Sequence, residues 1–586
     1  MRIRLLVGVL LGLSLCAGTT LAVAPPPAVG REFMVVTAQH EATEVGVAIL
    51  EAGGNAIDAA VAVGYALAVT HPAAGNLGGG GFMTIHLADG RDTFINFRET
   101  APQRATRDMF LDADGSVAPS RSIEGYLAVG VPGTPAGLDY ALTNYGTMPR
   151  TRVIAPAIHL ASEGFVLGQG DVDVLAIGTK KFRAEPNVAA TFLKQGQAPF
   201  AVGDRLVQPQ LARTLALLAA EGPDAFYLGP IADKIVAASD ANGGVLSKGD
   251  FIRYKVEELA PIRAKYRGFD IISAPPPSSG GIIACEILNV LAGYPMKDFG
   301  FHSAKSVHLM VEAMRRAYLD RTLLGDPHFV RNPVAHLLSD AHAAEIRQAI
   351  DPEHATPSDQ LQSAPPPPRE EGTQTTHYSV VDKFGNAVAV TYTINGYFGA
   401  SRIAGDTGFF LNNEMDDFTA KPGAPNLYGL VQGEGNAVAP GKRPLSSMTP
   451  TIVLKNGQPF LVVGSPGGSR IITTTLEVIM NVIDFNMNIQ EAVNEPRIHH
   501  QWQPDVVYHE PRALSADTVA TLERMGHHLT LQGPWSSAQS IEVPFADIQT
   551  GPPTPSGQGN VGNTLRKDGR YGGWDPRSVA GSARGR

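Results

Sequence analysis

The chain changes character within the stretch APPPPREEGTQTTHYSVVD, residues 364–382. Its first half holds four consecutive prolines and the charged run Arg369–Glu371, so it can supply neither core packing nor ladder hydrogen bonds. Residues 376–381 then alternate in the manner of a strand, and residues 386–394 repeat the pattern after a turn. The sequence therefore predicts an exposed linker over 364–374 that ends directly before a β-hairpin.

The boundary between Gln374 and Thr375 also suggests a form of chemistry. If the chain were cut there, Thr375 would carry a hydroxyl nucleophile and its own α-amine. An α-amine has a pKa of about 7.7–8.0, so it can act as the base for that hydroxyl near neutral pH. A threonine at the start of a strand is common, however, and the pattern alone favours that simpler interpretation.

Further elements follow from hydrophobic periodicity and turn residues. Helices are predicted over 41–51, 56–69 and 469–481 and from a Ser303 N-cap onward, and strands over 82–87, 451–455 and 460–464. The Gly/Pro-rich region 549–575 is predicted to be a long surface loop. It contains a literal G-x-G-x-x-G at 557–562, but without a flanking strand and helix this match does not indicate dinucleotide binding.

Two polar motifs each allow two interpretations. Residues 464–469, Gly-Ser-Pro-Gly-Gly-Ser, connect a predicted strand to a predicted helix, and their amides could stabilise an oxyanion or simply form a tight turn. Residues 412–417, Asn-Asn-Glu-Met-Asp-Asp, could bind an ammonium group or form a capped turn. The pair His499–His500 lacks a further ligand at metal spacing, so a structural role is favoured over metal binding.

Composition and the N-terminus restrict the class of protein. The chain has 586 residues, 44% of them hydrophobic, and a net charge of −9, which argues against nucleic acid as a partner. Residues 1–24 have two arginines before a short apolar run, which predicts a signal peptide and an exported, periplasmic or secreted protein without a membrane span. Removal of the leader, and with it Cys16, would leave only Cys285, which is predicted to be a buried structural thiol.

Several of these segments together resemble the γ-glutamyltranspeptidase family. The resemblance rests on residues 375–382, 412–418, 443–448 and 464–470, and in the N-terminal half on 53–60, 78–82 and 97–102. It runs from about residue 33 to 535 and resumes at 575–578. It implies an α+β fold, the four-layer αββα sandwich of N-terminal-nucleophile hydrolases. It also implies self-cleavage between Gln374 and Thr375, giving a large subunit (25–374) and a small catalytic subunit (375–586) that form a heterodimer.

The resemblance also implies roles for individual residues. Thr375 would be the nucleophile and Thr393 its hydrogen-bonding partner, with the amides of Gly467 and Gly468 forming the oxyanion hole. The α-carboxylate of a γ-glutamyl donor would be held by Arg98, Ser446 and Ser447. Its α-ammonium group would be held by Asn395, Glu414 and Asp417. Tyr428 would gate a lid formed by 422–428.

The implied reaction is cleavage of the γ-glutamyl amide of glutathione and related donors. The acyl group would pass from Thr375 to water or to an amino acid or dipeptide amine, and no cofactor or metal is required. Residues 396–400 depart from the sequence typical of bacterial members, so acceptor preference is left open. The alternatives are a glutaryl (cephalosporin) acylase of the same superfamily and a catalytically silent exported binding protein.

Overall fold

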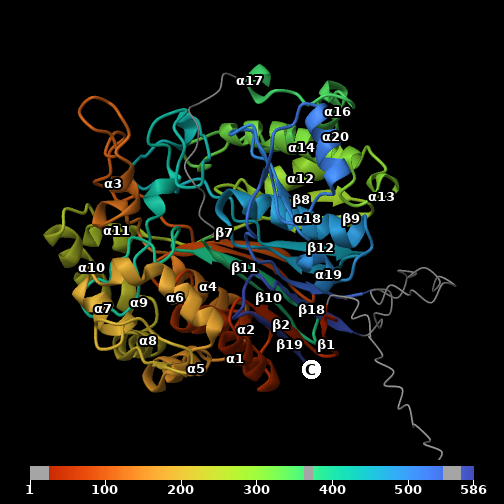
Figure 1. The fold of residues 1–586 in the computed structure, drawn as a ribbon. Helices are drawn as coiled ribbons and strands as arrows, with labels where there is room; N and C mark the ends of the chain where they lie inside the picture. The colour runs from red at the N-terminus through yellow and green to blue at the C-terminus, as the bar shows by residue number, and fades with distance from the viewer. Residues whose placement is uncertain (1–24, 362–373, 545–568) are drawn as a thin grey trace, which may run out of the picture.

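Two stacked β-sheets form the centre of the molecule, with a layer of helices on each outer face (Figure 1). The computed structural model describes residues 25–361, 374–544 and 569–586. Each sheet has seven strands, and every pairing in both sheets is antiparallel. The four-layer αββα sandwich expected from the resemblance is confirmed.

The first sheet carries the predicted hairpin at its centre. Strands β10 (Thr376–Val381) and β11 (Ala387–Thr393) pair with Thr376 opposite Tyr392. The order of the sheet is β19-β2-β10-β11-β3-β4-β7. The other strands are β19 (Ser582–Gly585), β2 (Met34–Thr37), β3 (Gly80–His86), β4 (Asp92–Asn96) and β7 (Glu257–Leu259).

The second sheet has the order β1-β18-β17-β13-β12-β9-β8. Its strands are β1 (Ala28–Gly30), β18 (Arg570–Trp574), β17 (Gln539–Glu542), β13 (Gln458–Val463), β12 (Thr451–Lys455), β9 (Phe269–Ser273) and β8 (Ile262–Tyr266). Smaller sheets pair β14 (Ile498–His499), β15 (Val507–His509) and β16 (Leu529–Leu531), and β5 (Phe165–Val166) with β6 (Arg205–Leu206).

Helices cover the outer face of each sheet. On the first sheet lie α1 (His40–Glu51), α2 (Ala56–Thr70), α4 (Thr134–Tyr145), α5 (Arg150–Glu163), α6 (Gln169–Phe182), α7 (Pro186–Phe192), α8 (Pro209–Glu221), α9 (Asp224–Tyr227), α10 (Pro230–Ala241) and α11 (Lys248–Arg253). On the second lie α12 (Gly280–Leu291), α13 (Met296–Phe299), α14 (Ala304–Asp320), α15 (Val334–Leu337), α16 (Asp340–Ala349), α18 (Ile471–Ile483), α19 (Ile489–Asn494) and α20 (Ala516–Arg524). Two short helices, α3 (Pro119–Ile123) and α17 (Ser358–Leu361), lie at the periphery in Figure 1.

The alternation of β10 explains how the layers pack. Tyr378 and Val380 face the helices of the first layer, whereas Val381 joins the apolar core between the two sheets. That inner core also contains Val36, Ile452 and Val462. Since both faces of the strand are buried, a slip of one residue would exchange these environments, so the register that places Thr375 is strongly fixed.

Local sequence signals account for most element boundaries. Asn55 and Asp58 form a capping box at the start of α2, and the Ser303 hydroxyl accepts the Ser306 N–H at the start of α14. Cys285 is a buried free thiol on α12, as predicted. The helix predicted from Ser469 begins at Ile471 instead, because the preceding glycines adopt a 3₁₀ turn over Gly468–Arg470.

The predicted surface loop over 549–575 is wrong at its C-terminal end. Residues 570–574 form β18, which lies between β1 and β17 in the second sheet. Gly572 belongs there because a Cβ at this position would lie 2.7 Å from the Met34 sulfur of the first sheet. Residues 549–568 of that region lie outside the described residues, as do the predicted leader 1–24 and linker residues 364–373.

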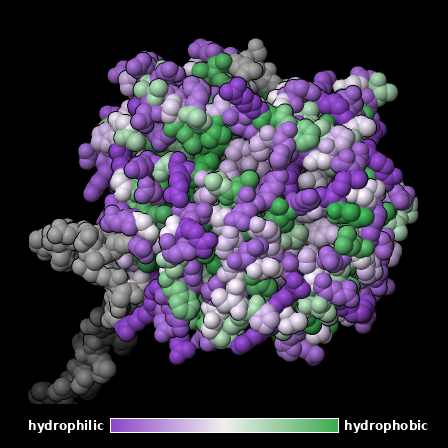
Figure 2. All heavy atoms as spheres, turned by 180° about the vertical axis from the view of Figure 1, so that it is seen from behind, coloured by the Kyte–Doolittle hydropathy of each residue, from purple (hydrophilic) through white to green (hydrophobic). Residues whose placement is uncertain are grey.

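The apolar surface residues that the structure describes do not gather into one large patch on the face shown in Figure 2. Figure 2 shows separate apolar groups scattered among hydrophilic residues on the face turned away from Figure 1. Within 25–361, 374–544 and 569–586, no helix combines the length and apolar composition needed to cross a bilayer.

Candidate active site

Thr375 lies immediately before β10, opposite the end of β11. Its Oγ1 is 3.1 Å from the Thr393 Oγ1, and Thr393 in turn accepts the Asn395 N–H at 2.8 Å. The pairing of Thr376 with Tyr392 produces this contact, since the next residue outward on each strand is the threonine. The structure therefore brings the predicted nucleophile and its predicted partner together at the centre of the first sheet.

The backbone of Thr375 is strained. Its φ is +114°, in a region that a β-branched residue rarely adopts. Such a conformation costs of order 1–3 kcal/mol and persists only where the surroundings impose it, typically at functional sites. This angle turns about the N–Cα bond of Thr375, so the strain lies directly beside the Gln374–Thr375 peptide.

The glycine loop between β13 and α18 faces the same peptide. The Gly467 N–H donates to the Gln374 carbonyl oxygen at 3.2 Å. Gly467 and Gly468 have φ of +132° and +56°. A Cβ on Gly467 would lie 2.1 Å from the Ser536 Oγ, and one on Gly468 would lie 2.2 Å from the Tyr428 ring. Both the backbone conformation and the space therefore require glycine, and the loop presents an amide donor to a carbonyl beside Thr375.

Tyr428 covers this loop. Its ring lies against Gly468, and its hydroxyl donates to the Asn395 carbonyl oxygen at 2.9 Å. Burial raises the pKa of Tyr428 well above its ordinary value, so the phenol stays protonated and keeps donating. Tyr428, the predicted gate residue, is thus linked through Asn395 to Thr393.

Arg98 forms the charged centre of the site. It is fully buried just after β4, and its Nη1 and Nη2 donate to the carboxylates of Glu414 and Asp417, the latter at 2.5 Å. Its Nε donates to the Pro444 carbonyl oxygen at 3.2 Å. Burial acts to lower the pKa of Arg98, but the neighbouring carboxylates outweigh it and the pKa is raised. Three predicted residues therefore form one buried ion cluster.

Glu99 belongs to this cluster although the sequence reasoning gave it no role. Its carboxylate is 3.7 Å from Arg98 Nη1, it is fully buried, and neither oxygen accepts a hydrogen bond from the described residues. Burial raises its pKa to about 7, opposed in part by Arg98. Glu99 stood within the motif over 97–102, but adjacency to Arg98 in sequence does not reveal that both side chains are buried together.

The two predicted serines have different partners. The Ser447 Oγ accepts from Arg321 Nη2 at 3.2 Å, whereas the Ser446 Oγ accepts the Met448 N–H at 3.1 Å. Arg98 reaches this segment only through the Pro444 carbonyl. Thus Ser447 lies beside a second arginine, which the sequence reasoning missed because an arginine at the end of a helix is expected from the helix dipole alone.

Arg321 is unusual among the buried charges of this region. Its Nε donates to the Ser279 Oγ at 2.9 Å, but it forms no ion pair within 4 Å and its Nη1 has no hydrogen-bond partner among the described residues. Burial lowers its pKa to about 10, so it stays charged at neutral pH. The positive charge left without a direct partner beside Ser447 suits an incoming anion.

Asn395 connects the two parts of the site. Its Nδ2 donates to the Asn413 carbonyl oxygen at 2.9 Å, next to Glu414, while its own N–H reaches Thr393. A cavity of about 350 Å³ opens beside Thr375, lined among others by Tyr397, Trp535, Ser536 and Arg577. Nucleophile, amide donor and charge cluster are thus joined by short contacts, with space for a small molecule at Thr375.

Comparison with known proteins identifies the family of the chain. The sequence family described as gamma-glutamyltranspeptidase matches residues 42–560. The chain is 55% identical over 573 residues to the glutathione hydrolase proenzyme of Pseudomonas sp. (strain A14), covering 97% of each protein. It is 50% identical to that of Escherichia coli (strain K12), covering 94% of this chain and 92% of the other.

A solved structure supports the fold across the whole chain. The cephalosporin acylase of Bacillus halodurans superimposes with a TM-score of 0.81 at 28% identity, covering 97% of this chain and 98% of the other. Both of these relatives carry the glutathione hydrolase name, and the family match spans most of the chain. This protein therefore belongs to the γ-glutamyltranspeptidase family.

Proposed function

We propose that this enzyme is a γ-glutamyltransferase and glutathione hydrolase that works through a γ-glutamyl ester on Thr375. The main observation behind this proposal is that the Thr375 hydroxyl and the Gly467 N–H both lie at the Gln374 carbonyl. The Thr375 hydroxyl follows the Gln374 carbonyl directly, and that carbonyl accepts the Gly467 N–H. A nucleophile and an amide donor arranged around one carbonyl are what acyl transfer requires.

The first acyl transfer would be the maturation of the precursor. The Thr375 hydroxyl adds to the Gln374 carbonyl, and the Gly467 N–H stabilises the resulting oxyanion. The C–N bond then breaks, which leaves an ester between Gln374 and the threonine oxygen and a free amine on Thr375. Water hydrolyses the ester. The products are a large subunit, 25–374, and a small subunit, 375–586, which stay together because β10 and β2 pair across them.

Turnover would use the same groups on an external amide. The new α-amine of Thr375 takes the hydroxyl proton as the oxygen attacks the donor's γ-carbonyl. The Gly467 and Gly468 amides hold the oxyanion, and the leaving amine departs with a proton. The γ-glutamyl ester is then cleaved by water or by the amine of an amino acid or dipeptide, which enters through the cavity beside Thr375.

Recognition of the donor would rest on its zwitterionic end. Arg98, Ser446 and Ser447 hold the α-carboxylate, and Asn395, Glu414 and Asp417 hold the α-ammonium group. The existing contacts support this assignment, because Arg98 already pairs with Glu414 and Asp417. A zwitterion can insert its two charges into such a pair and keep every buried charge compensated.

We also propose that the protein is exported, on the basis of residues 1–24. The leader has the charge and apolar run of a signal peptide. Cleavage near Ala22 or Ala24 would leave the N-terminus just before β1.

The experiment that tests the function combines mass and activity. The purified protein is denatured, its fragments are weighed and sequenced from their N-termini, and the native protein is assayed with a γ-glutamyl anilide donor with and without a dipeptide. We expect two fragments, one beginning at Thr375, and anilide release that the dipeptide accelerates. A single stable chain without turnover would refute the proposal.

Asp417 distinguishes this function from that of a glutaryl acylase. A glutaryl side chain has no α-amine, so an acylase needs no acid at this position. We expect Asp417→Ala to lower kcat/KM for a γ-glutamyl donor by about 10²-fold, as for a lost hydrogen bond to a charged group. Turnover of a glutaryl amide by the same variant should fall far less. Equal losses on both substrates would remove Asp417 from ammonium recognition.

We further propose Arg321 as a positioning residue that orients Ser447 toward the donor carboxylate. Arg321→Gln should raise KM for the donor by about tenfold with a smaller change in kcat, since the lost charge acts on binding. Arg321→Lys should recover part of that loss. A purely structural role would instead lower the thermal midpoint while leaving KM unchanged, and lysine would not restore it.

A further inference from the structure

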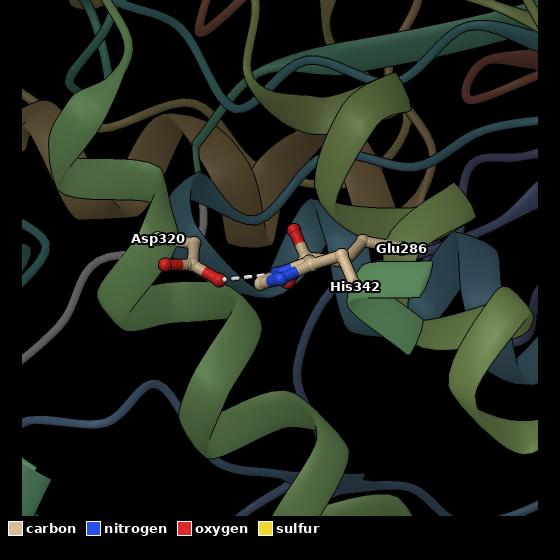
Figure 3. A group of neighbouring side chains, drawn as sticks. All are labelled: Glu286, Asp320 and His342. Carbon is tan, nitrogen blue, oxygen red and sulfur yellow. Dashed lines mark hydrogen bonds and ion pairs between the residues drawn. The ribbon is translucent and has the colours of Figure 1, made fainter. Parts of the chain in front are cut away.

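Three side chains outside the active site point toward one another in the second helical layer (Figure 3). Glu286 comes from the middle of α12, Asp320 is the last residue of α14, and His342 lies near the start of α16. The His342 Nε2 is 2.9 Å from Asp320 Oδ2 and 3.5 Å from Glu286 Oε1. One oxygen from each acid and one imidazole nitrogen all lie within 4.8 Å of one another.

The chain alone does not satisfy this cluster. Glu286 is fully buried, and neither of its oxygens accepts a hydrogen bond from the described residues. The His342 Nε2 lies 3.5 Å from Glu286 Oε1, carries at most one hydrogen and is closer to Asp320. One N–H cannot serve two carboxyl groups that converge on it, so the buried Glu286 carboxyl has no close donor from the chain, and burial raises its pKa to about 8.

A divalent cation at the common point would resolve this conflict. It would bind the unprotonated nitrogen and one oxygen from each acid, and its charge would balance the two carboxylates. In a tetrahedral zinc site with bonds of about 2.0–2.2 Å, ligand atoms are roughly 3.3–3.6 Å apart. The 3.5 Å between His342 and Glu286 matches this spacing, whereas the 2.9 Å between His342 and Asp320 is a hydrogen-bond length that would have to widen by about 0.5 Å on metal binding. Nitrogen and carboxylate oxygen are donors that zinc accepts.

The surroundings also suit a bound ion. Asp320 and His342 are 23% and 12% exposed at their side chains, so an ion can enter and a water can complete the coordination. The other imidazole nitrogen, Nδ1, is 3.9 Å from the Glu345 carboxylate. At this separation the two groups form an ion-pair contact rather than a hydrogen bond, so Glu345 would have to approach by about 1 Å to orient the ring as acids behind zinc-bound histidines do.

We propose that Glu286, Asp320 and His342 form a binding site for a divalent transition-metal cation, for which Zn²⁺ is the best match. The ion would tie together α12, α14 and α16, which contribute one ligand each. Its role is structural, since none of the three residues contacts the Thr375 site. The proposal does not depend on the proposed function.

The test measures Zn²⁺ binding to the purified, chelator-treated protein. We expect calorimetric titration to give one Zn²⁺ per chain and the thermal midpoint to rise by a few degrees on saturation, as mass action requires for an ion that binds the folded state. Glu286→Gln and His342→Ala should each weaken binding at least tenfold and abolish the rise. His354→Ala is the matched control, because His354 is an exposed histidine 3.4 Å from Asp351, and it should bind as the parent does.

Two results would overturn the proposal. One is the absence of stoichiometric Zn²⁺ binding to the parent protein. The other is binding that Glu286→Gln and His342→Ala leave unchanged, which would place the ion on surface histidines. If either variant fails to fold, Asp320→Asn replaces it, since that side chain is partly exposed, and γ-glutamyl turnover verifies that each variant tested is folded.

Discussion

Replacing Thr375 with alanine should leave one uncut chain and lower γ-glutamyl turnover by a factor of about 10⁴ or more. A loss of this size is typical when a nucleophile that acts with its base is removed. The variant has no hydroxyl to attack the Gln374 carbonyl, and without cleavage residue 375 has no free amine. Denaturing mass spectrometry and the anilide assay measure both effects on one sample.

Two control variants distinguish the loss of the Thr375 hydroxyl from a general disturbance of β10. Thr375→Ser keeps the hydroxyl and should still be cut into two fragments. Thr376→Val removes the neighbouring hydroxyl, which is buried on the same strand and has no hydrogen-bond partner among the described residues; it should be cut and active. Normal cutting of Thr375→Ala between residues 374 and 375 would refute the assignment of the nucleophile.

Replacing Arg98 with lysine should reduce kcat/KM for γ-glutamyl donors by about 10²–10³-fold while leaving the chain cut. Lysine keeps the charge but not the planar fork, so it cannot hold Glu414 and Asp417 at once. The Glu414 or the Asp417 carboxylate is then buried without a hydrogen-bond donor. In addition, the α-carboxylate of the γ-glutamyl substrate loses its bidentate partner. Cutting should persist because Arg98 does not contact the Gln374–Thr375 peptide.

The matched control for this change is Arg91→Lys. Arg91 pairs with Asp89 at 2.8 Å on an exposed turn after β3, and exposed pairs contribute little. Its kinetics should equal those of the parent. If Arg98→Lys keeps kcat/KM within about twofold of the parent, Arg98 does not bind the donor carboxylate.

Patterns local in sequence predicted the central elements well. The strands β10 and β12 begin and end at the predicted residues, because alternation and turn residues act over a few positions. β18 was missed since its glycines suggest a loop, whereas here they allow the two sheets to approach closely. The close approach of the sheets depends on residues distant in sequence, so the pattern within 570–574 alone could not predict this strand.

The sequence predicted only those site residues that lie in the motifs shared with the family. Arg98 and Glu414 are 316 residues apart, so nothing in the spacing indicates that they touch. The resemblance supplied that grouping. Arg321 and Glu99 lay outside the residues it assigned, and their importance follows from complete burial, which depends on how β4, α14 and the segment around Ser447 pack together.

The hydrogen bond between Gly467 and the Gln374 carbonyl has a consequence for when the enzyme becomes active. Before cutting, the chain's own carbonyl occupies the amide that a donor's carbonyl would need. If the chain is cut as proposed, the uncut precursor is blocked by its own backbone, in addition to lacking the amine base. On the proposed mechanism, cutting would free the Thr375 amine at once. The Gly467 N–H would become available to a donor only when the new Gln374 carboxylate moves away from it, so activation would need both cleavage and departure of that chain end.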